Sequence, residues 1–124
     1  MESLAPNIFI HDIARTIAYY QQLGFSTIAR VPEAGEPVWV MMNCGDVNLM
    51  FQTFQSVEGT LPVVRRDDGG SLLLYIKMKG IRTFYNRIRD HVEVLSGLEK
   101  TFYGATEFSI RDINNYMLTF AEDE

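Results

Sequence analysis

The sequence contains a single cysteine, Cys44, among 124 residues. One thiol cannot form an internal disulfide, so a secreted disulfide scaffold is excluded. A zinc finger and a CxxC redox site are excluded as well, because both need more cysteines. A lone thiol fits a reducing compartment, and we therefore expect a cytoplasmic protein.

Long apolar runs and basic charge are also scarce. No apolar run approaches the roughly 18 residues that a membrane-spanning helix needs. The N-terminal MESLAPNIF lacks the basic patch and long apolar stretch of a signal peptide. Eleven Lys and Arg against sixteen Asp and Glu give a formal net charge of −5. This balance disfavours nucleic acid or an anionic membrane as a partner and suits a cationic ligand, although it is also ordinary for a soluble protein.

What the chain does contain is core-forming composition: 47% of its residues are hydrophobic and 22% are charged. Such a chain folds as a globular domain, and its length predicts one domain over 1–124. Within it, 1–54 show a β-α-β-β-β order. Strands are expected over 5–10, 25–31, 38–43 and 47–54. The helix begins after Asp12, a good N-cap, and stops at Gly24.

The second half, 72–124, repeats this order. Strands are expected over 72–78, 91–95, 101–111 and 116–121, with a helix that opens at Gly80 and a turn at Asn114-Asn115. The two modules are joined by a connector over 55–71. A connector of this length in a small domain is either a functional lid or a mobile linker.

Side-chain alternation assigns one face of each predicted sheet to the helix and leaves the other face open. Ile8 and Ile10 face the helix in the first strand, whereas Phe9 faces away. The open-face positions include Phe9, Met50, Gln52, Tyr75 and Thr119. Two curved sheets with such faces form a cleft, which is where a functional site is expected.

The stretch DIARTIAYYQQLGF, from Asp12 to Phe25, is similar to the pattern D-[LI]-x-x-[ST]-[IL]-x-[FY]-Y-x-x-[LV]-G-[FM] of the vicinal oxygen chelate superfamily. WVMMNCG at 39–45, VNLM at 47–50 and EFSIRD at 107–112 support the resemblance. That superfamily holds glyoxalase I, extradiol dioxygenases, fosfomycin-modifying enzymes and bleomycin-resistance proteins. The resemblance covers almost the whole chain and implies an α+β fold, with two βαβββ modules forming curved mixed sheets around a cleft.

Enzymes of this superfamily hold a divalent metal through His, Gln or Glu side chains at four open-face positions. Carried over, the positions are Ala5, Met50 (or Gln52), Leu73 (or Leu74 or Ser71) and Thr119. Alanine and leucine are not metal ligands, and threonine is a poor one. The resemblance therefore implies no metal, no cofactor and no catalytic residue. His11 and His91 are interpreted as surface histidines.

The chain resembles the metal-free, drug-sequestering branch of the superfamily, closest to bleomycin-resistance proteins. We expect its cleft to bind an aromatic or cationic compound without catalysis. The predicted ligand-binding residues are Phe9, Trp39, Met50, Gln52, Tyr75, Tyr103 and Thr119. Trp39 is the strongest candidate because it is the only tryptophan and lies on a strand that borders the cleft. Taken alone, each aromatic is better explained as a core or edge residue.

Two alternatives stay open. A metal-dependent lyase or dioxygenase of the same superfamily would need an unusual site, for example from Gln52, Glu107 and His91. An interaction module whose ligand has been lost is the other. Glu107, together with Arg111, is more simply explained by an exposed cross-strand ion pair. The chain is expected to act as a homodimer, because sheet edges stay exposed and because two chains complete each cleft in the family.

Overall fold

A computed structural model describes residues 1–59 and 72–124 and divides the chain into two compact units, one in each range. The predicted connector 55–71 lies outside the described residues from position 60 onward. In the described part, no helix is both long and apolar enough to cross a membrane.

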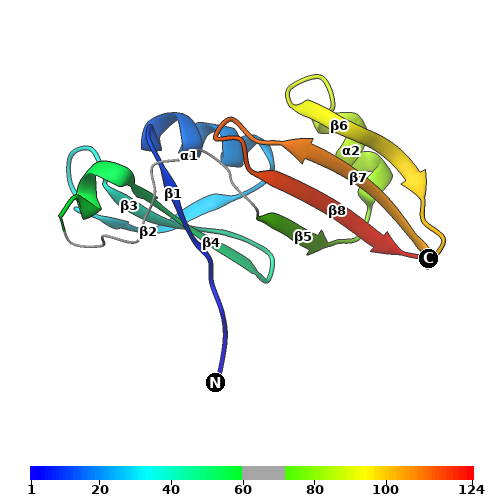
Figure 1. The fold of residues 1–124 in the computed structure, drawn as a ribbon, viewed down its shortest axis with the longest axis horizontal. Helices are drawn as coiled ribbons and strands as arrows, with labels where there is room; N and C mark the ends of the chain where they lie inside the picture. The colour runs from blue at the N-terminus through cyan, green and yellow to red at the C-terminus, as the bar shows by residue number, and fades with distance from the viewer. Residues whose placement is uncertain (60–71) are drawn as a thin grey trace. The chain divides into compact units, whose positions relative to one another are not determined.

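The first unit has the predicted β-α-β-β-β order, shown in blue to green in Figure 1. Its elements are β1 (Asn7–Ile10), α1 (Ile13–Gln22), β2 (Ser26–Val31), β3 (Trp39–Cys44), β4 (Val47–Thr53) and the short 3₁₀ helix η1 (Phe54–Val57). The strand order is β1-β4-β3-β2, with β1 parallel to β4 and the other neighbours antiparallel. The start of the predicted connector is therefore folded, and burial of Phe54 and Val57 makes η1 part of the core of the unit.

Helix α1 begins and ends where the sequence predicts. The Asp12 side chain accepts the backbone N–H of Arg15 at 3.0 Å, so one free donor of the first turn is satisfied. Gly24 follows the helix with a φ of 105°, which favours glycine. Buried Tyr20 lies with its ring 4.6 Å from that of Phe51 in β4. The apolar stripe of α1 thus packs on one face of the sheet.

The second unit repeats the order, in green to red in Figure 1. Its elements are β5 (Leu73–Lys77), α2 (Ile81–Ile88), β6 (Glu93–Lys100), β7 (Ala105–Arg111) and β8 (Met117–Asp123). The strand order is β5-β8-β7-β6, again with one parallel pair, β5 with β8. The rings of Phe84, Phe108 and Phe120 pack together between α2 and the sheet. Two four-stranded mixed sheets, each with one helix, make this an α+β fold.

The predicted boundary between the second and third strands of this unit is wrong. The sequence predicted a strand ending at Leu95 and another beginning at Thr101, whereas β6 continues to Lys100 and residues 101–104 form the turn. Gly97 lies inside β6. A Cβ at this position would lie 3.2 Å from the hydroxyl oxygen of Tyr85, so glycine here allows α2 to approach the strand closely.

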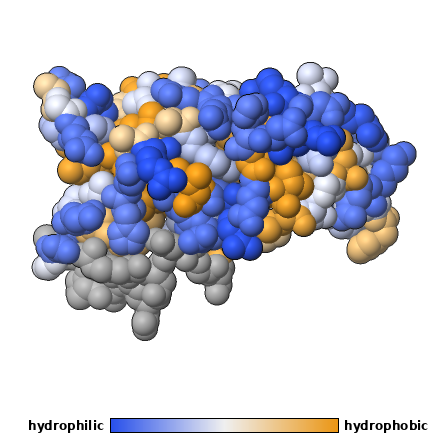
Figure 2. Space-filling model, turned by 90° about the horizontal axis from the view of Figure 1, so that it is seen from above, coloured by the Kyte–Doolittle hydropathy of each residue, from blue (hydrophilic) through white to orange (hydrophobic). Residues whose placement is uncertain are grey.

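The burial pattern confirms the predicted alternation in β1, β3, β4 and β5, whereas in β8 Thr119 and Ala121, predicted to face away from the helix, are buried. Ile8, Ile10 and Phe51 are buried beneath α1, whereas Phe9 and Met50 on the opposite face are half-buried. Figure 2 shows hydrophilic residues over much of the surface in that view, with apolar residues between them. Each sheet therefore has one face in the core and one more open face. Six of the seven predicted site residues lie on strand positions of these open faces, and Tyr103 lies in the turn before β7.

Candidate functional site

The open face of the first unit brings four predicted site residues together. In the sheet register, Gln52 lies between Phe9 on β1 and Trp39 on β3, and Met50 lies one row along on the same face. All four are half-buried. Because β4 lies between β1 and β3, this row places the Gln52 amide between two aromatic side chains, one on each neighbouring strand.

The amide of Gln52 is held in one orientation. Its Oε1 accepts a hydrogen bond from Nδ2 of Asn7 at 2.8 Å, and its Nε2 donates to Oγ of Ser56 at 3.0 Å. The ring of Phe54 lies 6.0 Å from that of Phe9. A fixed amide between aromatic and apolar side chains is the composition of a small-molecule site, which has apolar walls and few polar anchors.

The open face of the second unit brings Tyr75 and Tyr103 together on one carboxylate. Both hydroxyls donate to Oε2 of Glu107, each at 2.5 Å. Tyr75 is 46% exposed and Tyr103 is 57% exposed. Thr119 and Ala121, the residues of β8 between β5 and β7, are small, so the Tyr75 side chain can reach across them to Glu107. That pair of small residues is the sequence signal for this contact.

The ion pair predicted for Glu107 is wrong, because its carboxylate accepts the two phenols instead. For Arg111 the prediction is confirmed: its Nε lies 3.6 Å from Oε2 of Glu93 on the neighbouring strand. The hydrogen bond to Glu107, followed by burial and the nearby negative charge, raises the pKa of Tyr75 well above its usual range. The same hydrogen bond raises the pKa of Tyr103. Both phenols are therefore protonated donors at neutral pH.

Thr119, the seventh predicted site residue, offers little surface. It is 6% exposed, and its hydroxyl shares a 2.8 Å hydrogen bond with that of Ser109 on the neighbouring strand. It lies beside Tyr75 in the register. The seven predicted residues thus form two sets, one in each unit, and a cleft common to both sets stays a prediction.

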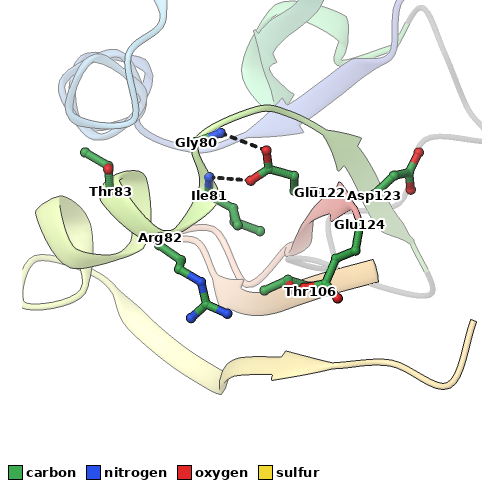
Figure 3. Close-up of a pocket in the computed structure, with 8 residues that line it drawn as sticks. All are labelled: Gly80, Ile81, Arg82, Thr83, Thr106, Glu122, Asp123 and Glu124. Carbon is green, nitrogen blue, oxygen red and sulfur yellow. Dashed lines mark hydrogen bonds between the residues drawn. The ribbon is translucent and has the colours of Figure 1, made fainter. Parts of the chain in front are cut away.

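The sequence did not point to a pocket at the start of α2, with a volume of about 380 Å³ (Figure 3). It is lined by Gly80, Ile81, Arg82, Thr83, Thr106, Glu122, Asp123 and Glu124. The Glu122 carboxylate accepts the backbone N–H groups of Gly80 at 3.2 Å and Ile81 at 3.0 Å (Figure 3). These bonds lower the pKa of Glu122. The available signal was Gly80 itself, an N-cap residue without a side chain to cap the helix.

Within residues 1–59 and 72–124, no group of three or more His, Cys, Asp and Glu side chains is placed to hold a metal ion. Among the alternative ligands, Gln52 is hydrogen bonded to Asn7 and Ser56, and Glu107 to two tyrosines. Both histidines are exposed, as interpreted from the sequence, and the ring of His11 packs against Phe54 at 4.6 Å.

Comparison with known proteins agrees with this architecture. The sequence model of the Glyoxalase/Bleomycin resistance protein/Dioxygenase superfamily matches residues 4–120. This match covers nearly all of the chain, which therefore belongs to that superfamily. A search of curated protein sequences finds no match.

Several solved structures share the fold. TioX from Micromonospora sp. ML1 superposes with a TM-score of 0.80 at 14% identity, over 100% of both chains. The bleomycin resistance determinant encoded on the transposon Tn5 gives a TM-score of 0.70 at 21% identity, over 100% of this chain and 99% of that one. A bleomycin-binding protein, crystallised as its complex with bleomycin, gives 0.68 at 20% identity over 100% of both chains. At these identities the likeness establishes the fold.

Proposed function

We propose that this protein binds an aromatic or cationic small molecule and sequesters it without catalysis. The observation that carries the proposal is the row Phe9–Gln52–Trp39, in which an amide fixed by hydrogen bonds separates two half-buried aromatic side chains. Planar ligands stack on such rings, and a ring face also attracts a cation. The bleomycin-binding protein that shares this fold supports a proposal of the same class of function.

Residue chemistry supports binding over catalysis. The superfamily positions that hold metal in its enzymes are here occupied by side chains such as Ala5, Met50 and Leu73, which do not ligate the hard or borderline divalent metals these enzymes use. We therefore assign Met50 to the apolar wall of the site. Elemental analysis of the purified protein provides an independent check. Stoichiometric zinc, nickel, manganese or iron would contradict a purely sequestering role.

Titration of the intrinsic fluorescence with bleomycin tests the binding site. Trp39 is the only tryptophan, so the emission reports on the proposed site directly. We expect a saturable change in emission as the ligand stacks on the indole. Calorimetry under the same conditions shows whether the ligand binds at all. A ligand that binds by calorimetry while leaving the emission unchanged would place its site away from Trp39 and refute this assignment.

We also propose that the two units act as one functional domain within a homodimer in a reducing compartment such as the cytoplasm. Edge strands β2 and β5 expose Val31 and Leu73, which are large apolar residues that association would cover. The lone Cys44 is free, as a reduced thiol would be. Sedimentation at tens of micromolar concentration is expected to show a dimer, and a monomer would contradict this assembly.

A further inference from the structure

We propose that Tyr75, Glu107 and Tyr103 on the second sheet form a subsite for a small organic cation with several N–H donors, such as an ammonium or amidinium group. This inference rests on the proposed small-molecule binding and adds to it the charge and hydrogen-bonding character of the ligand. The three residues come from β5, from β7 and from the turn before β7. They will be called the Tyr–Glu–Tyr cluster.

The cluster presents hydrogen-bond acceptors and no donors. Each phenol has one proton, and both protons are donated to Oε2 of Glu107 at 2.5 Å. What remains is Oε1 of the carboxylate and the lone pairs of two phenol oxygens. The raised pKa values of Tyr75 and Tyr103 keep this arrangement in place at neutral pH. A group that brings several donors and a positive charge is the complement of such a surface.

The negative charge of Glu107 is not balanced by a cation of the described chain. The nearby cations on this face have other partners: Nζ of Lys77 lies 3.0 Å from Oδ2 of Asp123, and Nε of Arg111 lies 3.6 Å from Oε2 of Glu93. Within residues 1–59 and 72–124, the interactions of Glu107 are those with the two phenols. Directly opposite it in the register lies Glu99, a like charge, and a bound cation would relieve this unfavourable pair.

The rings around the carboxylate favour the same ligand. Tyr75 and Tyr103 are both exposed, and the fully exposed ring of Phe102 lies 5.1 Å from that of Tyr103 in an edge-to-face arrangement. Aromatic faces attract cations, and a planar amidinium can also stack on them. The turn that carries Phe102 and Tyr103 is closed by a backbone hydrogen bond, in which the N–H of Thr101 donates to the carbonyl of Ala105 at 2.8 Å. The cluster therefore combines charge, acceptors and rings on a defined backbone.

A matched pair of probes tests the proposal: benzamidinium and neutral benzamide, which have nearly the same shape. Each is titrated into the full chain and followed by the backbone amide signals of residues 75, 103 and 107 in NMR spectra. We expect benzamidinium to bind at least tenfold more tightly than benzamide. In Glu107→Gln, which keeps the shape of the side chain, we expect benzamidinium affinity to fall at least tenfold. Glu33→Gln removes the same charge from an exposed position of the first unit and should change the affinity less than twofold.

Two results would overturn the proposal. Equal binding of benzamide and benzamidinium would show a site for rings without charge selection. An equal loss in Glu33→Gln and Glu107→Gln would show that the net charge of the protein attracts the probe. Should Glu107→Gln not fold, the comparison of benzamidinium with benzamide in the unmodified protein still tests the cluster. Benzamidinium that shifts other amide signals and leaves those of residues 75, 103 and 107 unchanged would contradict the proposal.

The bleomycin titration of Trp39 emission separates this inference from the proposed function. Cation binding that depends on Glu107, without any response of Trp39 to bleomycin, would preserve the subsite and refute the aromatic site on the first unit. A response of Trp39 to bleomycin, without selection for benzamidinium over benzamide, would preserve the aromatic site on the first unit and refute the subsite.

Discussion

Glu122 closes the first turn of α2 from the last strand of its own unit: Oε1 accepts the backbone N–H of Ile81 at 3.0 Å. Oε2 of the same carboxylate accepts the N–H of Gly80 at 3.2 Å. In the first unit the equivalent role belongs to Asp12, the N-cap residue itself. Two helices of the same repeated pattern are thus capped in different ways, one locally and one through the sheet.

Replacing this remote cap should destabilise the second unit. Glu122→Ala leaves two backbone donors of α2 without their carboxylate, and we expect the melting temperature to fall by several degrees. Glu2→Ala is a matched control, because it removes the same charge from an exposed position near the N-terminus. Circular dichroism of both variants provides the measurement. Equal melting temperatures for Glu122→Ala and the wild type would show that water replaces the carboxylate without cost.

The same contact predicts a dependence on pH. The hydrogen bonds from Ile81 and Gly80 hold the pKa of Glu122 below its ordinary value of 4.5. A carboxyl group whose pKa is lower in the folded state stabilises the fold above its unfolded pKa, and this stabilisation is lost as the pH falls through the lowered value. We therefore expect the difference in melting temperature between the wild type and Glu122→Gln to be constant near neutral pH. It should shrink as the pH falls below about 4.5.

Local patterns were sufficient for the fold but not for all of the site. The repeated βαβββ order and the open-face positions follow from alternation and from caps such as Asp12, which act between near neighbours in sequence. The Tyr75–Glu107 contact of the Tyr–Glu–Tyr cluster and the Glu122 cap join residues more than thirty positions apart. The polar group with which such a residue forms a hydrogen bond depends on the strand register and on whether the side chains between the two are small. For that reason the sequence predicted an ion pair for Glu107, whereas in the structure its carboxylate accepts hydrogen bonds from two phenols.

The buried hydroxyl pair of Ser109 and Thr119 provides a test of register on the second sheet. The two oxygens lie 2.8 Å apart, and both residues are less than 10% exposed. Thr119→Val keeps the shape but leaves the Ser109 hydroxyl without this partner, which should cost about 1–3 kcal/mol of unfolding free energy. Ser109→Ala should cost a similar amount.

The double variant is the informative control for this pair. With both hydroxyls removed, no buried polar group is left without a partner, and the loss should be clearly smaller than the sum of the two single losses. Urea unfolding of the four proteins gives the coupling energy. Strictly additive losses would show that the hydroxyls satisfy their hydrogen bonds elsewhere.

Trp39→Ala tests the aromatic site on the first unit. Stacking on an aromatic side chain contributes about 1–3 kcal/mol in nucleic-acid complexes, which we use as a scale. Since about 1.4 kcal/mol is a factor of ten, the variant should bind a planar ligand such as bleomycin roughly ten- to a hundredfold more weakly by calorimetry. Trp39 is half-buried on the open face, so the variant should still unfold cooperatively. Trp39→Phe keeps a ring at this position and should retain an intermediate affinity. If Trp39→Ala loses its folded structure instead, the indole belongs to the core of the unit and the stacking role assigned to it is wrong.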